Sequence, residues 1–163
     1  VTSTLYNLTV DTAAPNTPTL LSVTDDQGPN TGTLTSGQAT NDQQPTLTGT
    51  AEAGAIVRIL DNGVQIGETT AGSDGRWTFS PDSALSNGSH TLTITATDAA
   101  GNVSTPTQGF VVVVDNVPPQ APLISQAIDD QGSITGPVGS GQPTNDAQPV
   151  LNEIGRASCR ERV

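Results

Sequence analysis

The chain has 163 residues and a formal net charge of −11, from five Lys and Arg against sixteen Asp and Glu. A chain this acidic repels nucleic acids and anionic membranes and attracts cations. No apolar run approaches the length of a membrane-spanning helix, and aromatic residues make up only 2% of the chain. The single cysteine, Cys159, leaves no disulfide to form within the chain, so cysteine usage says nothing about the redox compartment.

Seven short runs between residues 19 and 114 predict β-strands, because apolar and polar residues alternate and turn residues separate the runs. No window keeps apolar residues at helical spacing. The clearest alternation covers residues 90–97, where Leu92, Ile94 and Ala96 share one face and threonines the other. Asp61-Asn62-Gly63 supplies the left-handed positions of a tight hairpin. The expected strands are 19–23, 46–51, 55–60, 64–67, 76–80, 90–97 and 108–114.

This arrangement predicts an all-β fold, an immunoglobulin-like seven-stranded β-sandwich, because seven strands in about 100 residues around a buried Trp are typical of that class. The inter-sheet disulfide of antibody domains is missing, so packing alone must join the sheets. We expect Leu85 to lie under the loop that follows Pro81. The predicted core consists of Trp77, Phe79, Phe110, Leu47, Val57, Ile59, Ile94 and Leu92.

The segment 11–47 returns as 115–151 at a constant offset of 104 residues, with 18 of 37 positions identical and no gap. Such self-similarity indicates a tandem array. We therefore expect the last strand of one repeat in residues 1–10, a complete domain in 11–114, here called the module, and the truncated start of the next repeat in 115–152. That start should hold one strand and part of another.

Residues 153–163 leave the repeat abruptly. The string Glu-Ile-Gly-Arg-Ala-Ser-Cys-Arg-Glu-Arg-Val resembles a translated short-read sequencing adapter, and we expect it to be non-native. The alternative is a divergent continuation of the repeat. Without this tail, two arginines against fourteen acids leave a net charge of 2 − 14 = −12.

Acidic residues gather in the connections expected at the two ends of the sandwich. Stacked modules would bring two acidic sets and a linker aspartate together, and their repulsion would be on the order of several kcal/mol at low effective dielectric. Ca²⁺ would remove that cost, since it takes six to eight oxygen ligands in irregular geometry, whereas no His/Cys cluster suits zinc. The predicted ligands are Asp25, Asp26, Asp42, Asp98 and Asp115.

A turn role is the alternative for such residues, because Asp and Asn side chains hydrogen-bond nearby backbone groups. That reading is favoured for Asp61, Asn62, Asp74, Asp82 and Asn87. His90 has no nucleophile or acid partner in its surroundings along the sequence, so we expect it to pack rather than to catalyse. No catalytic site is predicted, and the chain is not expected to be an enzyme.

Four motifs carry a resemblance to a known family: V-D-T-A-A-P at 10–15, T-N-D-x-x-P-T-L-T-G-T-A-E-A-G at 40–54, D-G-x-W-x-F around Trp77, and T-A-T-D-A-A-G-N-V-S at 95–104. Together they resemble the bacterial Ig-like repeats of giant, biofilm-associated repetitive adhesins, and the resemblance extends to Asn152. It implies secretion by a type I system, an extracellular position on the cell surface, and a role as a stalk that carries a distal adhesive domain. It also implies Ca²⁺ at the junctions between modules, with Asp11 and Asp115 as linker ligands, Asp25, Asp26 and Asp42 at one end, and Glu52 and Asp98 at the other.

The resemblance further implies that the partners are neighbouring repeats of the same chain and that other domains bind the host or matrix ligand. Two alternatives stay open. A module that itself binds a carbohydrate or another ligand would need an exposed aromatic or apolar patch. A spacer domain of a secreted multidomain hydrolase would be distinguished only by the flanking sequence.

Overall fold

The computed structural model describes residues 9–121, 123–132, 135–140, 142 and 144–154. The chain divides into two compact units, Val1–Val117 and Pro118–Val163, which are considered separately. Every regular element among the described residues is a strand. Within that part of the chain, no helix has the length and apolarity needed to cross a membrane.

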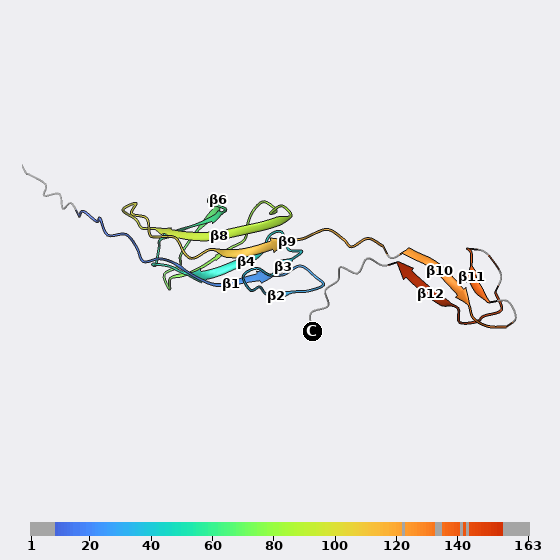
Figure 1. The fold of residues 1–163 in the computed structure, drawn as a ribbon. Helices are drawn as coiled ribbons and strands as arrows, with labels where there is room; N and C mark the ends of the chain where they lie inside the picture. Colours follow the sequence, from blue (N-terminus) through green and yellow to red (C-terminus); the bar gives the residue numbers. More distant parts are fainter. Residues whose placement is uncertain (1–8, 122, 133–134, 141, 143, 155–163) are drawn as a thin grey trace, which may run out of the picture. The chain divides into compact units, whose positions relative to one another are not determined.

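The first unit consists of two packed sheets (Figure 1). The four-stranded sheet has the order β2-β1-β4-β7, formed by β1 (Thr19–Asp25), β2 (Gly32–Thr33), β4 (Thr46–Thr50) and β7 (Arg76–Phe79). The five-stranded sheet has the order β3-β9-β8-β5-β6, formed by β3 (Ala39–Thr40), β5 (Ile56–Asp61), β6 (Val64–Thr70), β8 (Gly88–Thr97) and β9 (Phe110–Val114). The all-β sandwich prediction is confirmed.

All seven predicted strands are present, and the prediction missed two short ones, β2 and β3. Strand β2 pairs with the end of β1, whereas β3 pairs in parallel with β9 through Ala39↔Val113 and Thr40↔Val114. Both lie in the connection between β1 and β4, whose sequence predicts turns. Each strand has only two residues, too few to show an alternating pattern. Long-range pairing, rather than local periodicity, makes them strands.

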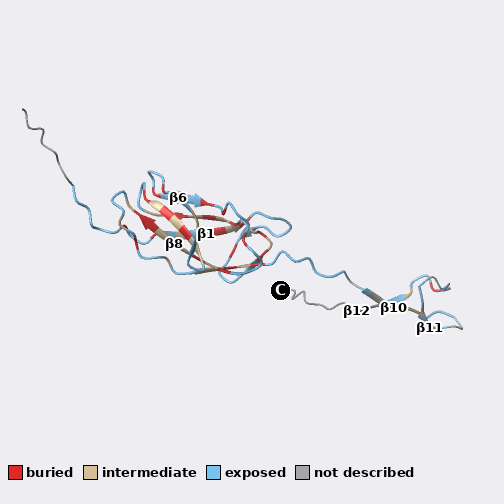
Figure 2. Ribbon diagram, turned by 90° about the horizontal axis from the view of Figure 1, so that it is seen from above, coloured by how far each residue is buried: buried red, intermediate tan, exposed pale blue. Residues whose placement is uncertain are grey.

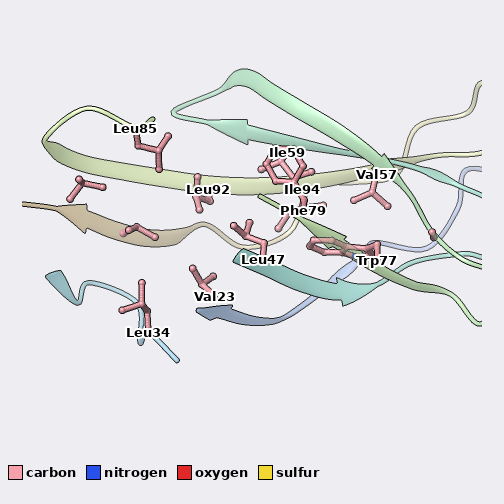
Figure 3. Close-up of a cluster of buried hydrophobic side chains, with 13 residues drawn as sticks. Val23, Leu34, Leu47, Val57, Ile59, Trp77, Phe79, Leu85, Leu92 and Ile94 are labelled. Carbon is pink, nitrogen blue, oxygen red and sulfur yellow. The ribbon is translucent and has the colours of Figure 1, made fainter. Parts of the chain in front are cut away.

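Side chains of both sheets form one core between them (Figure 3). Leu47 and Trp77 come from the four-stranded sheet, and Ile59 and Ile94 come from the five-stranded sheet. Along β8 the burial alternates between buried and intermediate residues, as the sequence pattern predicted (Figure 2). Leu85 is buried as expected, but Phe110 is only partly buried and packs against the edge of the core.

The turns have the expected backbone geometry at the β5–β6 hairpin. Asn62 and Gly63 have φ angles of 49° and 83°, both in the left-handed region. A two-residue hairpin of this type needs positive φ at both central positions, which Asn-Gly accepts at low cost.

The second unit is a three-stranded sheet of order β11-β10-β12, formed by β10 (Leu123–Asp129), β11 (Gly136–Val138) and β12 (Val150–Ile154). It reproduces the β2-β1-β4 pairing: Ala127↔Leu151 corresponds to Val23↔Leu47. The expectation of one strand and part of another was therefore too low. Leu151 is 53% exposed, whereas its counterpart Leu47 is fully buried, because this unit has no second sheet among its described residues to cover that position.

The expected non-native tail, 153–163, lies mostly outside the described residues. Strand β12 runs two residues into it, with Glu153 opposite Ile124 and Ile154 opposite Leu123. Backbone pairing is open to almost any side chain, so it leaves the origin of this segment a prediction.

Candidate functional site at the two ends of the module

The predicted site residues fall into two groups at opposite ends of the module. The incoming end is where the linker 9–18 joins β1, and it also carries the β4–β5 turn with Glu52 and the β8–β9 loop with Asp98, since Thr19 pairs with Thr50 and Ile56 with Thr97. The outgoing end is where β9 finishes at Val114. It carries Asp25, Asp26 and Asp42, and Figure 1 shows the chain entering and leaving the first unit at these two ends.

At the outgoing end, Asp25 and Asp42 are buried together with Thr40. The Thr40 hydroxyl donates to Asp25 Oδ2 at 2.5 Å and accepts from the Asp42 N–H at 2.9 Å. The remaining carboxylate oxygens accept from backbone: Asp25 Oδ1 from Gln27 N, and Asp42 Oδ1 and Oδ2 from Gln44 N and Asp26 N. All four oxygens thus accept a hydrogen bond within the loop, so neither buried carboxylate lacks a partner.

The same network recurs in the second unit. Thr144 Oγ1 donates to Asp129 Oδ2 at 2.7 Å and accepts from Asp146 N at 3.0 Å, and Gln131 N donates to Asp129 Oδ1 at 3.0 Å. Each residue lies 104 positions after its counterpart. The network forms around only three strands, so its geometry is encoded locally by the motifs D-D-Q-G and T-N-D.

The outgoing linker is bound to this end by several hydrogen bonds. Asp115 N donates to Thr40 O at 2.8 Å, and Asn116 N donates to Asn87 Oδ1 at 3.2 Å. Asn116 Nδ2 donates to Gln43 Oε1 at 3.2 Å, and Val117 N donates to Asp115 Oδ1 at the same distance. The chain therefore leaves the module along a fixed path up to Val117.

The incoming end is organised by Asp98 in the D-A-A-G-N loop. Its Oδ2 accepts from Asn102 Nδ2 at 2.8 Å, and its Oδ1 accepts from the N–H groups of Asn102 and Ala100. The Asn102 side-chain hydrogen bond, with the backbone donors, lowers the pKa of Asp98 despite the opposing effect of desolvation. Asn102 Nδ2 also donates to the carbonyl oxygen of Asp11 at 3.2 Å, which attaches the linker to this loop.

The described carboxylates of one module are spread apart rather than gathered into one cluster. Among the described residues, no group of three or more His, Cys, Asp or Glu is placed to hold a metal ion. The carboxylate oxygens of Asp25 and Asp42 all accept hydrogen bonds within the loop, which is the turn role expected of Asp and Asn side chains. Asp11, Asp26, Glu52 and Asp115 are exposed. Ca²⁺ takes six to eight oxygens, so any site would need ligands from a neighbouring module, and metal binding by these residues stays a prediction.

Sequence reasoning missed the polar partners that hold the carboxylates and linkers: Thr40, Gln43, Asn87, Asn102 and Asn116. Thr40 carried a signal, because T-N-D recurs at 144–146. Asn102 carried a weaker one as the last residue of D-A-A-G-N. Nothing in the local sequence marks Gln43. Asn87 is expected to bond nearby backbone in a turn, whereas the structure gives its side chain a partner 29 residues along the chain, Asn116 N.

His90 on β8 is buried and forms an ion pair with the half-buried Asp61 at the end of β5. His90 Nδ1 lies 2.7 Å from Asp61 Oδ2, and Nε2 lies 2.8 Å from the carbonyl oxygen of Ser86. Both neighbours are acceptors when Asp61 is ionised, so both ring nitrogens donate and the imidazolium form fits best. Burial lowers the pKa of His90, but the hydrogen bonds to Asp61 and Ser86 and the charge of Asp61 outweigh it and raise that pKa.

We expect the free energy of unfolding to fall as the pH rises from about 6 through the raised pKa of His90. The contribution is fully present below the unfolded-state pKa of about 6.5 and is lost above the folded-state value, because the folded state then gives up a proton that it had bound more tightly. Urea unfolding of residues 9–117 between pH 6 and pH 9 measures this. His90→Gln should flatten the profile, and an equally steep profile in that variant would contradict the assignment.

Two packed sheets of four and five strands, with the linkers at opposite ends, define an immunoglobulin-like β-sandwich. The model of the bacterial Ig-like domain family matches residues 16–116, which cover every strand from β1 to β9. The chain therefore belongs to the bacterial Ig-like domain family. The search of curated proteins found no match.

Proposed function

We propose that the chain is a non-enzymatic extender of a large repetitive surface adhesin, in which modules stack end to end and hold a distal adhesive domain away from the cell. The observation that carries this proposal is that the two linkers join opposite ends of the module and that each is hydrogen-bonded to it, through Asn102 at one end and Thr40 at the other. Each such module therefore adds its full length to the array. The 104-residue internal repeat supplies the tandem neighbour.

The surface of the module favours this proposal over ligand binding. Trp77 and Phe79 are 3% and 8% exposed and lie inside the core, so neither can stack on a sugar ring. The net charge of −11 opposes nucleic-acid binding. We place the protein outside the cell in a biofilm-associated adhesin, exported by type I secretion, with neighbouring repeats as its partners and the host or matrix ligand left to other domains.

Calcium at the joint between modules is the finer part of the proposal. The exposed carboxylates of Asp11 and Glu52 and the half-buried carboxylate of Asp98 at the incoming end, and the exposed carboxylates of Asp26 and Asp115 at the outgoing end, are the groups that would contribute oxygens. When bound, Ca²⁺ would neutralise the repulsion between these acidic ends. The protein's own residues fix where the carboxylates stand, through the Asp98–Asn102 loop and the Asp25–Thr40–Asp42 network.

A two-module protein tests the extender and its calcium dependence together. This protein joins residues 9–119 to residues 16–117, which keeps the natural 104-residue repeat. We expect its maximum dimension in small-angle scattering to be near twice that of one module. Ca²⁺ at about 100 times its Kd should add about 2.7 kcal/mol of stability and raise the melting temperature by several degrees relative to chelator. A compact particle or a broad ensemble in both conditions would refute the extender. Melting temperatures that do not change with chelator would refute the calcium joint alone.

A further inference from the structure

Asp115, the aspartate of the outgoing linker, is bound through its backbone N–H to the module that precedes it. Asp115 N donates to Thr40 O at 2.8 Å, and the next residue, Asn116, is bound to Asn87 and Gln43. Thr40 is itself buried and fixed by Asp25 and Asp42. The backbone N–H of Asp115 is thus attached to a fixed part of its own module.

Asp11, the equivalent aspartate at the incoming end, is bound through its backbone carbonyl oxygen. Asn102 Nδ2 donates to the carbonyl oxygen of Asp11, and the same nitrogen donates to Asp98. The local turn is alike in the two copies: Ala13 N donates to Asp11 Oδ1 at 3.0 Å, as Val117 N donates to Asp115 Oδ1 at 3.2 Å. Beyond Asp11, Pro15 and Pro18 are buried, and Thr17 hydrogen-bonds to Thr105. The linker is therefore anchored along the module that follows it.

We propose that in the array each linker aspartate joins two modules by hydrogen bonds to its own main chain, without a metal ion. The N–H of Asp115 binds Thr40 O of the preceding module, and its C=O accepts from the side chain of the residue equivalent to Asn102 in the following module. The partner is another copy of this domain. This inference rests on the proposed tandem arrangement, and it makes the D-A-A-G-N loop the surface that receives the neighbour.

The geometry explains how one residue can set the angle between modules. Its two anchors are the N–H and C=O of the same residue, so only its φ and ψ angles lie between them, since the peptide bonds are planar. The side-chain hydrogen bond from Val117 N closes a turn around those angles, and Pro118 and Pro119 restrict φ immediately beyond it. The joint therefore needs no metal ion to hold it. Calcium would act instead on the acidic side chains around the joint, by neutralising their repulsion.

The test uses the two-module protein, in which each copy retains the unit that has its own core. Ser73, exposed in the β6–β7 turn, is changed to Cys in both copies and spin-labelled, because residues 9–117 contain no cysteine. The distance distribution between the labels is measured in EDTA. Asn102→Ala in the second copy removes the donor that faces Asp115, whereas Asn102→Ala in the first copy faces Asp11 and is the matched control with the same loss within its loop.

We expect a narrow distribution for the unchanged protein in EDTA, a broader one for the second-copy variant, and no broadening for the first-copy variant. Asn87→Ala in the first copy, which removes the acceptor for Asn116 N, should also broaden it. Equal widths for both Asn102 variants and the unchanged protein would overturn the proposal and leave the extender standing. A distribution that is narrow only with Ca²⁺ would also overturn it. A broad distribution in both conditions would refute the extender itself.

Discussion

Replacing Gly49 by alanine is expected to destabilise the module by about 3 kcal/mol or more, at or beyond the upper end of the usual cost of overpacking a core. A Cβ atom at this position would lie 2.0 Å from the carbonyl oxygen of Thr19 and 2.3 Å from Trp77 Cζ2. The indole could turn aside, but the Thr19 carbonyl belongs to the β1–β4 pairing. One methyl group therefore forces the two strands apart. Since small domains have only about 5–15 kcal/mol of stability, this loss is a large share of the total.

Urea unfolding of residues 9–117, followed by the fluorescence of the single tryptophan, measures this effect. Gly28→Ala is the matched control, because no atom lies within 4 Å of the Cβ position there. We expect the control to stay within about 0.5 kcal/mol of the unchanged module, as surface substitutions usually do. Equal midpoints for the two variants would show that the contact between Gly49 and β1 is not as close as described.

Replacing Thr40 by valine is expected to cost about 3 kcal/mol. The change keeps the side-chain shape but removes the hydroxyl that donates to Asp25 Oδ2 and accepts from Asp42 N. Leaving a buried acceptor or donor unsatisfied costs about 1–3 kcal/mol, and more for a charged group. Here one carboxylate oxygen and one amide lose their partner in the same step, in a site where Asp25 and Asp42 are 4% and 1% exposed.

Thr70→Val on β6 is the control for Thr40→Val, since Thr70 is exposed at the end of an edge strand. Chemical denaturation of both variants gives the difference directly. We also expect faster amide exchange at Asp115, because the Thr40 carbonyl that accepts from that N–H is held in place by the hydroxyl's bonds to Asp25 and Asp42, which valine lacks. If the two valine variants were equally stable, the buried network would have no structural importance.

The strands could be predicted because their signal is local. Alternation along residues 90–97 and the Asn62-Gly63 turn fix the neighbouring strands without knowledge of the rest of the chain. Strands β2 and β3 could not be predicted, because two-residue segments show no period and their partners are set by the closed fold. The hydrophobicity of Phe110 predicts a fully buried side chain, but Phe110 is the first residue of β9 and is only partly buried.

The positions of the acidic residues could be predicted better than their roles. Strand direction alone puts Asp25 and Asp42 at one end of the module and Asp98 at the other. The sequence cannot show that Thr40 and backbone N–H groups occupy the oxygens of Asp25 and Asp42, because that depends on how the connection between β1 and β4 folds back. The same limit hid Asn102, whose side chain reaches a residue 91 positions earlier.

Residual dipolar couplings of the two-module protein show whether these modules form a stiff rod. In a weakly aligned sample, the backbone amide couplings report the orientation and order of each module separately. A rigid joint predicts that both modules fit one alignment tensor of the same magnitude. Two tensors of clearly different magnitude, with the modules themselves folded, would show that the linker moves freely and that the modules do not form a stiff rod.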